Sequence, residues 1–415
     1  MKTMKFKPSE VGPVPVDWEV KRLGGCCKKI GSGATPTGGA TVYLSHGVSL
    51  IRSQNVYNGY FKYEGLAHIT DSAASALDGV TVQDDDVLLN ITGDSVARCT
   101  KVPADVLPAR VNQHVAIIRI CSEELGSDYL QCYLASPDMQ TYMLNAASGQ
   151  GGSRNAMTKG MVEDFQIPIP PLPEQKAIAE ALSDVDALLA AMTKLIEKKR
   201  AIKQGAMQQL LTGKKRLAGF TGKWVEKRLG DVGEFVGGGT PSTAISSYWG
   251  GDIDWYTPAE IGYAKYVNSS NRRITNEGLR NSAARVLPAG AILLTTRASI
   301  GLRAILKHEA ATNQGFQSLI VNEESDSEFM YYFLSTVVEE MESRASGSTF
   351  LEISSSKLKE IPIVVPQTVA EQKAIASVLS DMDAEIAALE AKRAKYESIK
   401  QGMMQELLTG KTRLV

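Results

Sequence analysis

The sequence lacks the features that mark membrane and secreted proteins. No apolar run approaches the roughly 18 residues needed to cross a bilayer, and residues 1–10 carry charges but no apolar stretch typical of a secretory signal. We therefore expect a cytoplasmic protein. With 43% hydrophobic and 22% charged residues, the composition is typical of a soluble globular chain. The net charge of −1 gives no overall case for a nucleic-acid partner, so any such case must be local.

Cysteine and histidine are too few and too scattered to build a metal site. The cysteines are Cys26, Cys27, Cys99, Cys121 and Cys132, and the histidines are His46, His68, His114 and His308. No cysteines form a C-x-x-C pair, the second half has none, and the histidines show no ligand spacing. We expect no metal site and no disulfide in this chain.

Motifs for nucleotide binding and hydrolysis are also missing. Gly410, Lys411 and Thr412 imitate the end of a P-loop, but Gln405 stands where the motif needs a glycine. The sequence contains no G-x-G-x-x-G fingerprint and no G-x-S-x-G elbow. The acidic run 84–86 is better explained as a turn before a strand than as a metal site. A self-sufficient nuclease or ATPase is therefore disfavoured.

What the chain does contain is a long repeat. Residues 174–217 and 371–414 align without a gap, and more than half of the aligned positions are identical. Such a repeat indicates two copies of one unit. We predict a first globule over 1–173, a helix over 174–217, a second globule over 218–370 and a C-terminal helix over 371–415.

Each repeat has the heptad pattern of a long helix with one apolar seam. The seam residues are Ile178, Leu182, Val185, Leu189, Met192 and Ile196 in the first copy, and Ile375, Leu379, Met382, Ile386, Leu389, Tyr396 and Met403 in the second. Gly213 and Gly410 have the position of C-terminal helix stops. Because one exposed seam would be unstable, we expect the two helices to bury each other's seams.

The segments before the helices share short matches, such as Trp18 with Trp224 and Asn112–Gln113 with Asn313–Gln314. They are β-branched pieces bounded by Gly, Pro, Asn and Asp, which is typical of strand-rich mixed α/β globules. The fold class we predict is therefore mixed α/β (α+β), with two similar globules that each precede a long helix.

The doubled helix motif EQKAIA…LSD-x-D…IKQG-x-MQ-x-LLTGK-x-RL resembles the conserved regions of type I restriction–modification specificity (S) subunits. The segments before the globules, with Gly12-Pro-Val-Pro15 and Gly219-Phe-Thr-Gly222, are similar to the same family. The resemblance implies that each globule is a target-recognition domain that reads one half of a split double-stranded DNA site. It also implies an antiparallel coiled coil of the two helices, which sets the gap between the half-sites.

The same resemblance implies the partners and cofactors. The S subunit docks two methyltransferase (M) subunits, and restriction (R) subunits join the full complex. The resemblance implies that the S subunit carries no catalytic residue and holds no cofactor itself: S-adenosylmethionine belongs to the M subunits, and ATP and Mg²⁺ belong to the R subunits. A coiled-coil scaffold that binds proteins, and a specificity module of another phage-defence assembly, remain alternatives.

Candidate DNA contacts are polar side chains that suit base edges or phosphates and stand in expected loops. In the first globule they are Ser32, Thr35, Arg52, Ser53, Gln54, Asn55, Arg98, Asn112, Gln113 and Arg154. In the second they are Thr240, Ser242, Tyr256, Thr257, Arg297, Asn313, Gln314, Ser348 and Thr349. The Asn-Gln pairs occur in both halves, so a shared structural role competes with base reading. The basic run from Lys198 to Arg216 is either a solvated helix face or a contact to DNA or a partner.

Overall fold

The computed structural model describes residues 5–148, 155–347 and 351–414. Contacts between residues divide the chain into two units, one of residues 1–193 with 391–415 and one of residues 194–390. Each unit therefore combines one globule with parts of both long helices. The units group residues that are close in space, not residues that are consecutive in the chain. They do not test the four segment boundaries expected from the sequence, which stay a prediction.

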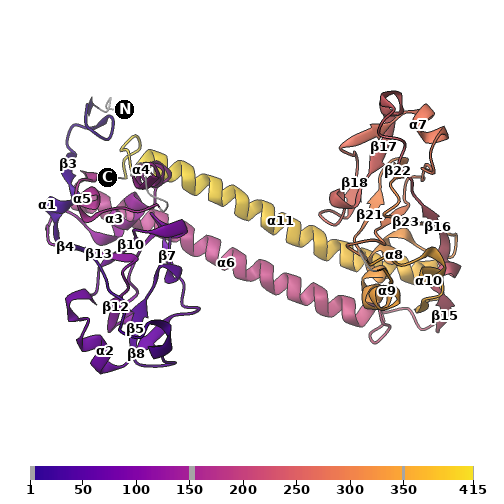
Figure 1. Cartoon of the computed structure of the whole chain (residues 1–415), viewed down its shortest axis with the longest axis horizontal. Coiled ribbons are helices and arrows are strands. Elements are labelled where there is room, and N and C mark those ends of the chain that lie inside the picture. The colour runs from indigo at the N-terminus through magenta and orange to yellow at the C-terminus, as the bar shows by residue number, and fades with distance from the viewer. Residues whose placement is uncertain (1–4, 149–154, 348–350, 415) are drawn as a thin grey trace. The chain divides into compact units, whose positions relative to one another are not determined.

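The globule of the first unit has two four-stranded sheets (Figure 1). One has the order β11 (Cys99–Lys101), β10 (Val87–Asn90), β13 (Val115–Ile120), β4 (Cys27–Ser32), and the other β8 (Ala67–Ile69), β5 (Val48–Ile51), β12 (Ala109–Val111), β9 (Thr81–Val82). The smaller pairs are β1 (Phe6–Lys7) with β2 (Val14–Pro15), β3 (Glu19–Arg22) with β14 (Gln166–Ile169), and β6 (Val56–Tyr57) with β7 (Tyr60–Phe61). The short helices are α1 (Leu23–Cys26), α2 (Asp71–Ser75), α3 (Ser127–Leu134), α4 (Pro137–Ser148) and α5 (Lys159–Glu163).

The globule of the second unit repeats this plan with different strand lengths. Its five-stranded sheet has the order β16 (Gly233–Gly237), β23 (Gln317–Val321), β20 (Ile292–Leu294), β21 (Arg303–Leu306), β18 (Tyr266–Val267). Its three-stranded sheet has the order β19 (Arg272–Ile274), β17 (Trp249–Tyr256), β22 (Ala310–Thr312), and β15 (Trp224–Arg228) pairs with β24 (Pro362–Pro366). The short helices are α7 (Asn276–Arg280), α8 (Ser327–Phe333), α9 (Val338–Arg344) and α10 (Ser355–Lys359). Parallel pairing of β5 with β12 and of β17 with β22 marks the shared topology. The predicted mixed α/β class with two similar globules is confirmed.

The repeats form the two long helices, α6 (Leu172–Leu210) and α11 (Val369–Leu407). Every predicted seam residue is buried or half-buried. In each unit the two helices run antiparallel, because ion pairs join the beginning of one to the end of the other: Asp186 to Lys400 in the first unit, and Asp383 to Lys203 in the second. In the described part of the chain, no helix combines the length and apolarity of a membrane span.

A glycine with left-handed backbone follows each long helix three residues after its last helical residue, where the sequence indicated a helix stop. Gly213 and Gly410 each have a φ of 69°. A side chain at Gly410 would lie 2.4 Å from the ring of Pro15, and one at Gly213 would press on Trp224. Both the backbone and the close packing therefore require glycine at these two positions.

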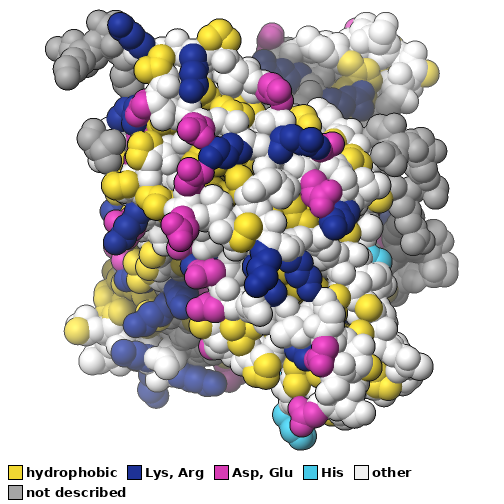
Figure 2. All heavy atoms as spheres, turned by 90° about the vertical axis from the view of Figure 1, so that its left-hand side faces the viewer, with side chains coloured by type: hydrophobic (Ala, Val, Ile, Leu, Met, Phe, Trp, Pro, Cys, Tyr) yellow, Lys and Arg dark blue, Asp and Glu magenta, His cyan; other side chains and the backbone are white. Residues whose placement is uncertain are grey.

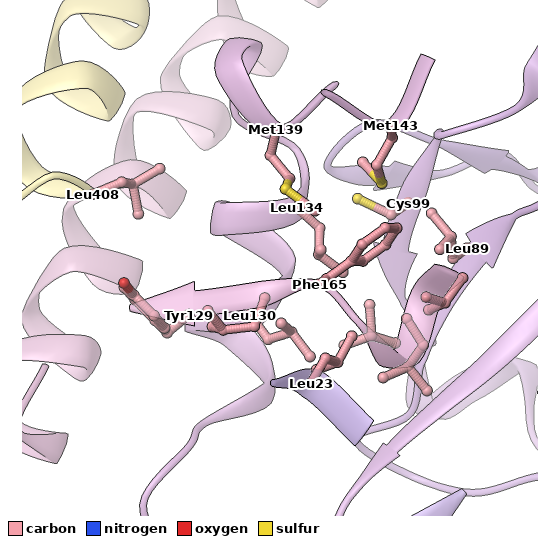
Figure 3. Close-up of a cluster of buried hydrophobic side chains, with 14 of the residues drawn as sticks. Leu23, Leu89, Cys99, Tyr129, Leu130, Leu134, Met139, Met143, Phe165 and Leu408 are labelled. Atoms are coloured by element: carbon pink, nitrogen blue, oxygen red, sulfur yellow. The ribbon is translucent and has the colours of Figure 1, made fainter. Parts of the chain in front are cut away.

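The main core of the first unit lies between its larger antiparallel sheet, α3, α4 and the long helices. Figure 3 shows Phe165, Leu23, Leu134 and Cys99 converging there, with Leu408 entering from the end of α11. The second unit buries Phe329, Leu294 and Leu379 in an equivalent cluster. The apolar starts and ends of the repeats thus belong to the globules' cores as well as to the helix pair.

Candidate nucleic-acid interface

The Glu-Gln pair that opens each repeat fastens a long helix to its globule. The Gln175 side chain accepts from the backbone N–H of Gly126 (2.9 Å) and donates to the Glu124 and Pro170 carbonyls (2.7 Å each). Gln372 makes the same three bonds in the second unit, with Asp326, Glu324 and Pro366 as partners. Because these contacts are buried, they fix the start of each long helix against the globule that precedes it.

The glutamates of the same pairs receive an arginine from the end of the other repeat. Arg413 donates to Glu174, which is fully buried and also accepts from the indole N–H of Trp18 (3.1 Å). A further bond to Asp17 (2.9 Å) lowers the pKa of that carboxyl. In the second unit Arg216 binds Glu371 through Nε (2.6 Å) and Nη2 (2.7 Å).

Glu174, Glu371 and Arg413 were absent from the residues singled out from the sequence, and Arg216 was named only as the end of the basic run. The sequence did contain an indication of them, because the glutamate and the arginine occur at equivalent positions in both repeats. What the repeat alone did not reveal is that each glutamate pairs with the arginine of the other copy.

Most of the basic run in α6 is neutralised within the second unit. Lys199 pairs with Glu385, Arg200 with Glu390 and Lys203 with Asp383, all at 2.5–2.6 Å. Lys198, Lys214 and Lys215, in contrast, are exposed. Of the predicted basic stretch, these three offer the accessible positive charge.

The loops that hold the candidate DNA contacts have a common construction in both globules. The hydroxyl of Thr35 donates to Gln113, and the hydroxyl of Thr240 donates to Gln314 (2.6 Å). In the first globule the side-chain oxygen of Asn112 accepts from the backbone N–H two residues later, at 3.2 Å. In the second globule the side-chain oxygen of Asn313 accepts from the backbone N–H of Gly315 (2.9 Å), which forms the same turn.

This repetition favours a structural role for the asparagines, while Thr35, Thr240 and both glutamines remain exposed. Ser32 and Ser242 are exposed as well. All of them therefore remain candidate contacts, with the two asparagines the least accessible.

The loops after β5 and β17 also correspond, as two 3₁₀ turns over Ser53–Asn55 and Pro258–Glu260. Asn55 accepts from the backbone N–H of Arg52 (3.1 Å), and Glu260 accepts from that of Thr257 (2.8 Å). Asn55 is wholly buried and is used up by this cap and by the Lys62 carbonyl.

Tyr256 is likewise buried, with 2% of its surface exposed, and burial raises its pKa to about 12. Its side chain is part of the core rather than of the surface. Arg52, which is half-buried, and Gln54, which is exposed, both donate to the Gly65 carbonyl, at 2.5 and 3.1 Å, and this fixes their positions.

A hollow of about 590 Å³ brings three of the predicted contacts together in the first globule: Ser53, Gln54 and Arg98. Tyr57 and His114, which the sequence did not single out, line it too. The guanidinium of Arg98 lies 4.7 Å from the centre of the Tyr57 ring. Polar donors on a concave surface are suited to contact the edge of a base.

The remaining candidates lie elsewhere. Arg297 is exposed and faces Glu352 at 3.8 Å in the second globule. Arg154, Ser348 and Thr349 lie outside the described residues.

Charge on the described surface is mixed rather than basic. Figure 2 shows Lys and Arg side chains interspersed with Asp and Glu on the face that it presents. Asp86, from the acidic run 84–86, is buried and paired with Arg119 (2.7 Å), as expected of a structural turn. No three His, Cys, Asp or Glu side chains gather as metal ligands within residues 5–148, 155–347 and 351–414.

Comparison with known proteins identifies the family. Residues 15–203 and 221–400 match the model of the type I restriction modification DNA specificity domain. The chain is similar to the MjaIX type I restriction enzyme specificity subunit of Methanocaldococcus jannaschii, with 43% identity over 39% of this chain and 38% of that one. Over its full length it is 25% identical to the putative MjaX specificity subunit of the same organism, covering 98% of it.

Solved structures with low sequence identity share the fold. The HsdS subunit from Thermoanaerobacter tengcongensis is 20% identical with a TM-score of 0.51, and the alignment covers 96% of this chain and 98% of that one. The S subunit from M. genitalium is 14% identical with a TM-score of 0.59, covering 98% and 97%.

Proposed function

Since the chain belongs to the type I restriction modification DNA specificity family, with one such domain in each half, we propose that each globule reads one half of a split double-stranded DNA site. The chain is a specificity subunit, which supplies recognition rather than catalysis. The observation that carries the proposal is the pair of equivalent loop systems, which share their turns and backbone hydrogen bonds while candidate contacts such as Arg52 and Thr257 differ between them. Two half-sites of different sequence require this combination.

The partners follow from the same role. The chain assembles with methyltransferase and restriction subunits on DNA, and we propose that two methyltransferase subunits dock on the helix pair. S-adenosylmethionine would then bind to those subunits, and ATP and Mg²⁺ to the restriction subunits. The mixed charge of the chain supports this division, because the partners can supply much of the contact to phosphates.

The first experiment is a genome-wide map of adenine methylation in cells that express this chain with its methyltransferase subunit. We expect a single split motif that disappears when this chain is omitted. If no motif appears, although the same methyltransferase subunit is active with another specificity subunit, the chain is a scaffold for proteins instead.

We further propose that the helix pair sets the unread gap between the half-sites. Each long helix is continuous over 39 residues, and each added residue lengthens a helix by about 1.5 Å. Inserting four residues at matched positions of both helices should lengthen the gap and leave both half-sites unchanged.

The control is a chain in which the same four residues replace four exposed helix residues, so that the helix length is kept. Altered half-sites with an unchanged gap would show that the helices do not act as a spacer.

A further inference from the structure

The two globules share the same backbone hydrogen bonds around the loop that follows β10 and β20, although this loop is one residue longer in the first globule. Asn90 donates to the Arg98 carbonyl (2.8 Å), and Thr295 donates to the Leu302 carbonyl (2.9 Å). Nearer the tip, the N–H of Gly93 bonds to the Asn155 carbonyl (3.0 Å). Because backbone bonds are independent of side-chain identity, they provide a strict alignment where sequence similarity is weak.

The same loops repeat two left-handed backbone positions. Gly93 has a φ of 76° and Ala298 a φ of 63°, and their N–H groups donate to the carbonyls of Asn155 and Leu351, each of which precedes an isolated β-bridge to the loop. Further along, Ala97 has a φ of 74° and Gly301 one of 90°. Alanine with positive φ is uncommon, so the surrounding fold imposes this path in both globules.

On this common backbone the side chains at equivalent positions differ. Arg98 corresponds to Leu302, which is 37% exposed. Ile91 and Thr296 bond to the carbonyls of His114 (3.0 Å) and Gly315 (2.9 Å), so His114 corresponds to Gly315. The matching 3₁₀ turns pair Gln54 with Ala259. A side chain needed for the fold would be expected in both globules, whereas one that reads a base need not be.

In the first globule these differing positions gather at one place, the hollow lined by Gln54, Tyr57, Arg98 and His114. Arg98 is stacked on Tyr57, which holds its guanidinium with the N–H groups available. Within the described part of the chain we find no hydrogen bond or ion pair from this guanidinium. His114 is held on both sides, by Thr92 at Nδ1 (2.5 Å) and by Gln113 at Nε2 (3.0 Å). The carboxylate of Asp94 also lines the hollow, and the guanidinium of Arg98 is its preorganised donor.

We propose that this hollow determines the base preference of the first globule, with Arg98 as the specificity-determining residue that binds a guanine edge in the major groove. The fork of an arginine matches the O6 and N7 acceptors of guanine, and such a contact discriminates by about 1–3 kcal/mol, or roughly 5- to 150-fold. Leu302 carries no donor, so the second globule must read its half-site with other residues. The inference rests on the proposed function and adds the residue and the base to it.

The test measures methylation rates by the complex of this chain with its methyltransferase subunit. The substrates are plasmids that carry the wild-type motif and every single substitution in both half-sites. For Arg98→Leu, which installs the residue of the second globule, we expect the preference for guanine at one position of the first half-site to fall by roughly 5- to 150-fold. The preferences in the second half-site should not change.

Arg22→Leu is the matched control. It removes an arginine from the same globule, but from β3 and an ion pair with Asp164, away from the hollow. Any loss should be uniform over all sites, because Arg22 does not line the hollow and its removal should leave base reading there intact.

Unchanged preferences at every position of the first half-site with Arg98→Leu would overturn the proposal. If that variant fails to fold, Arg98→Lys and Gln54→Ala carry the test, since lysine keeps the charge without the planar fork. Unchanged preferences in both of these variants would also overturn it. A wild-type complex without any split motif would instead refute the proposed function.

Discussion

The first and second globules hold their recognition loops with the same backbone hydrogen bonds, but they end differently at their junctions with the long helices. Arg413 of the first unit binds two carboxylates, Glu174 and Asp17. Arg216 of the second unit binds Glu371, and Lys223 occupies the position that corresponds to Asp17. The scaffold is therefore repeated, while its ionic reinforcement is stronger in the first unit.

A second difference lies where α3 and α8 face the long helices. Tyr332 of α8 donates to Asp383 (2.6 Å), which also pairs with Lys203. In α3 the corresponding residue is Cys132, so Asp186 keeps its lysine, while no tyrosine hydroxyl among the described residues donates to it. The first unit thus has its additional ion pair at the start of α6, where Arg413 binds Asp17 and Glu174, and the second unit has its additional hydrogen bond within α11, at Asp383.

The largest effect that can test this comparison is expected from Arg413→Ala. It leaves Glu174 charged, fully buried and without its cation, which costs about 3–5 kcal/mol in comparable cases. Arg216→Ala should destabilise the second unit less, because Arg216 contacts one carboxylate and is more exposed. Hydrogen exchange followed by mass spectrometry reports on both units in one molecule.

Lys223→Asp sharpens the same test by giving the second unit the carboxylate that it lacks. It should increase protection there by a few tenths of a kcal/mol, since the new pair would be exposed. Equal losses of protection for the two arginine variants would contradict the comparison.

A smaller effect is expected at the helix pair. Asp383→Asn weakens bonds to Lys203 and Tyr332, whereas Asp186→Asn weakens one bond to Lys400. We expect the first variant to cost about 1 kcal/mol more than the second in urea unfolding, which is the typical worth of one hydrogen bond. The difference should disappear in a Tyr332→Phe background; if it persists there, the phenol is not its cause.

The smallest effect should appear as a pH dependence. Burial raises the pKa of Glu328, but hydrogen bonds from Tyr266, Lys265 and Ser380 outweigh it and hold the pKa below its ordinary value of 4.5. A depressed pKa stabilises the fold above about pH 4.5 and loses that contribution as the pH falls through the folded value.

Glu328→Gln should therefore destabilise the second unit at about pH 7, and the difference from wild type should shrink as the pH falls below about 4.5. Urea unfolding at a series of pH values measures this. Asp128→Asn, at the corresponding position of the first unit, is the control, and a difference for Glu328→Gln that does not change with pH would exclude the assigned cause.

The sequence alone determined the long helices and their seams. Ile178, Leu182 and their counterparts could be identified because an apolar period of 3.5 residues is a local pattern, and the repeat supplied it twice. The mixed α/β class and the family followed from short patterns in the same way. Gly213 and Gly410 were recognisable as helix ends because left-handed backbone at a helix terminus favours glycine.

Only the tertiary structure decided which residues meet. Glu174 and Arg413 are 239 positions apart, and nothing local to either shows that they pair across the repeats. Tyr256 and Asn55 looked like surface contacts, but the strands around them bury both. The correspondence of Arg98 with Leu302 depends on backbone bonds between distant segments, because a loop's path is set by the segments it packs against rather than by its own residues.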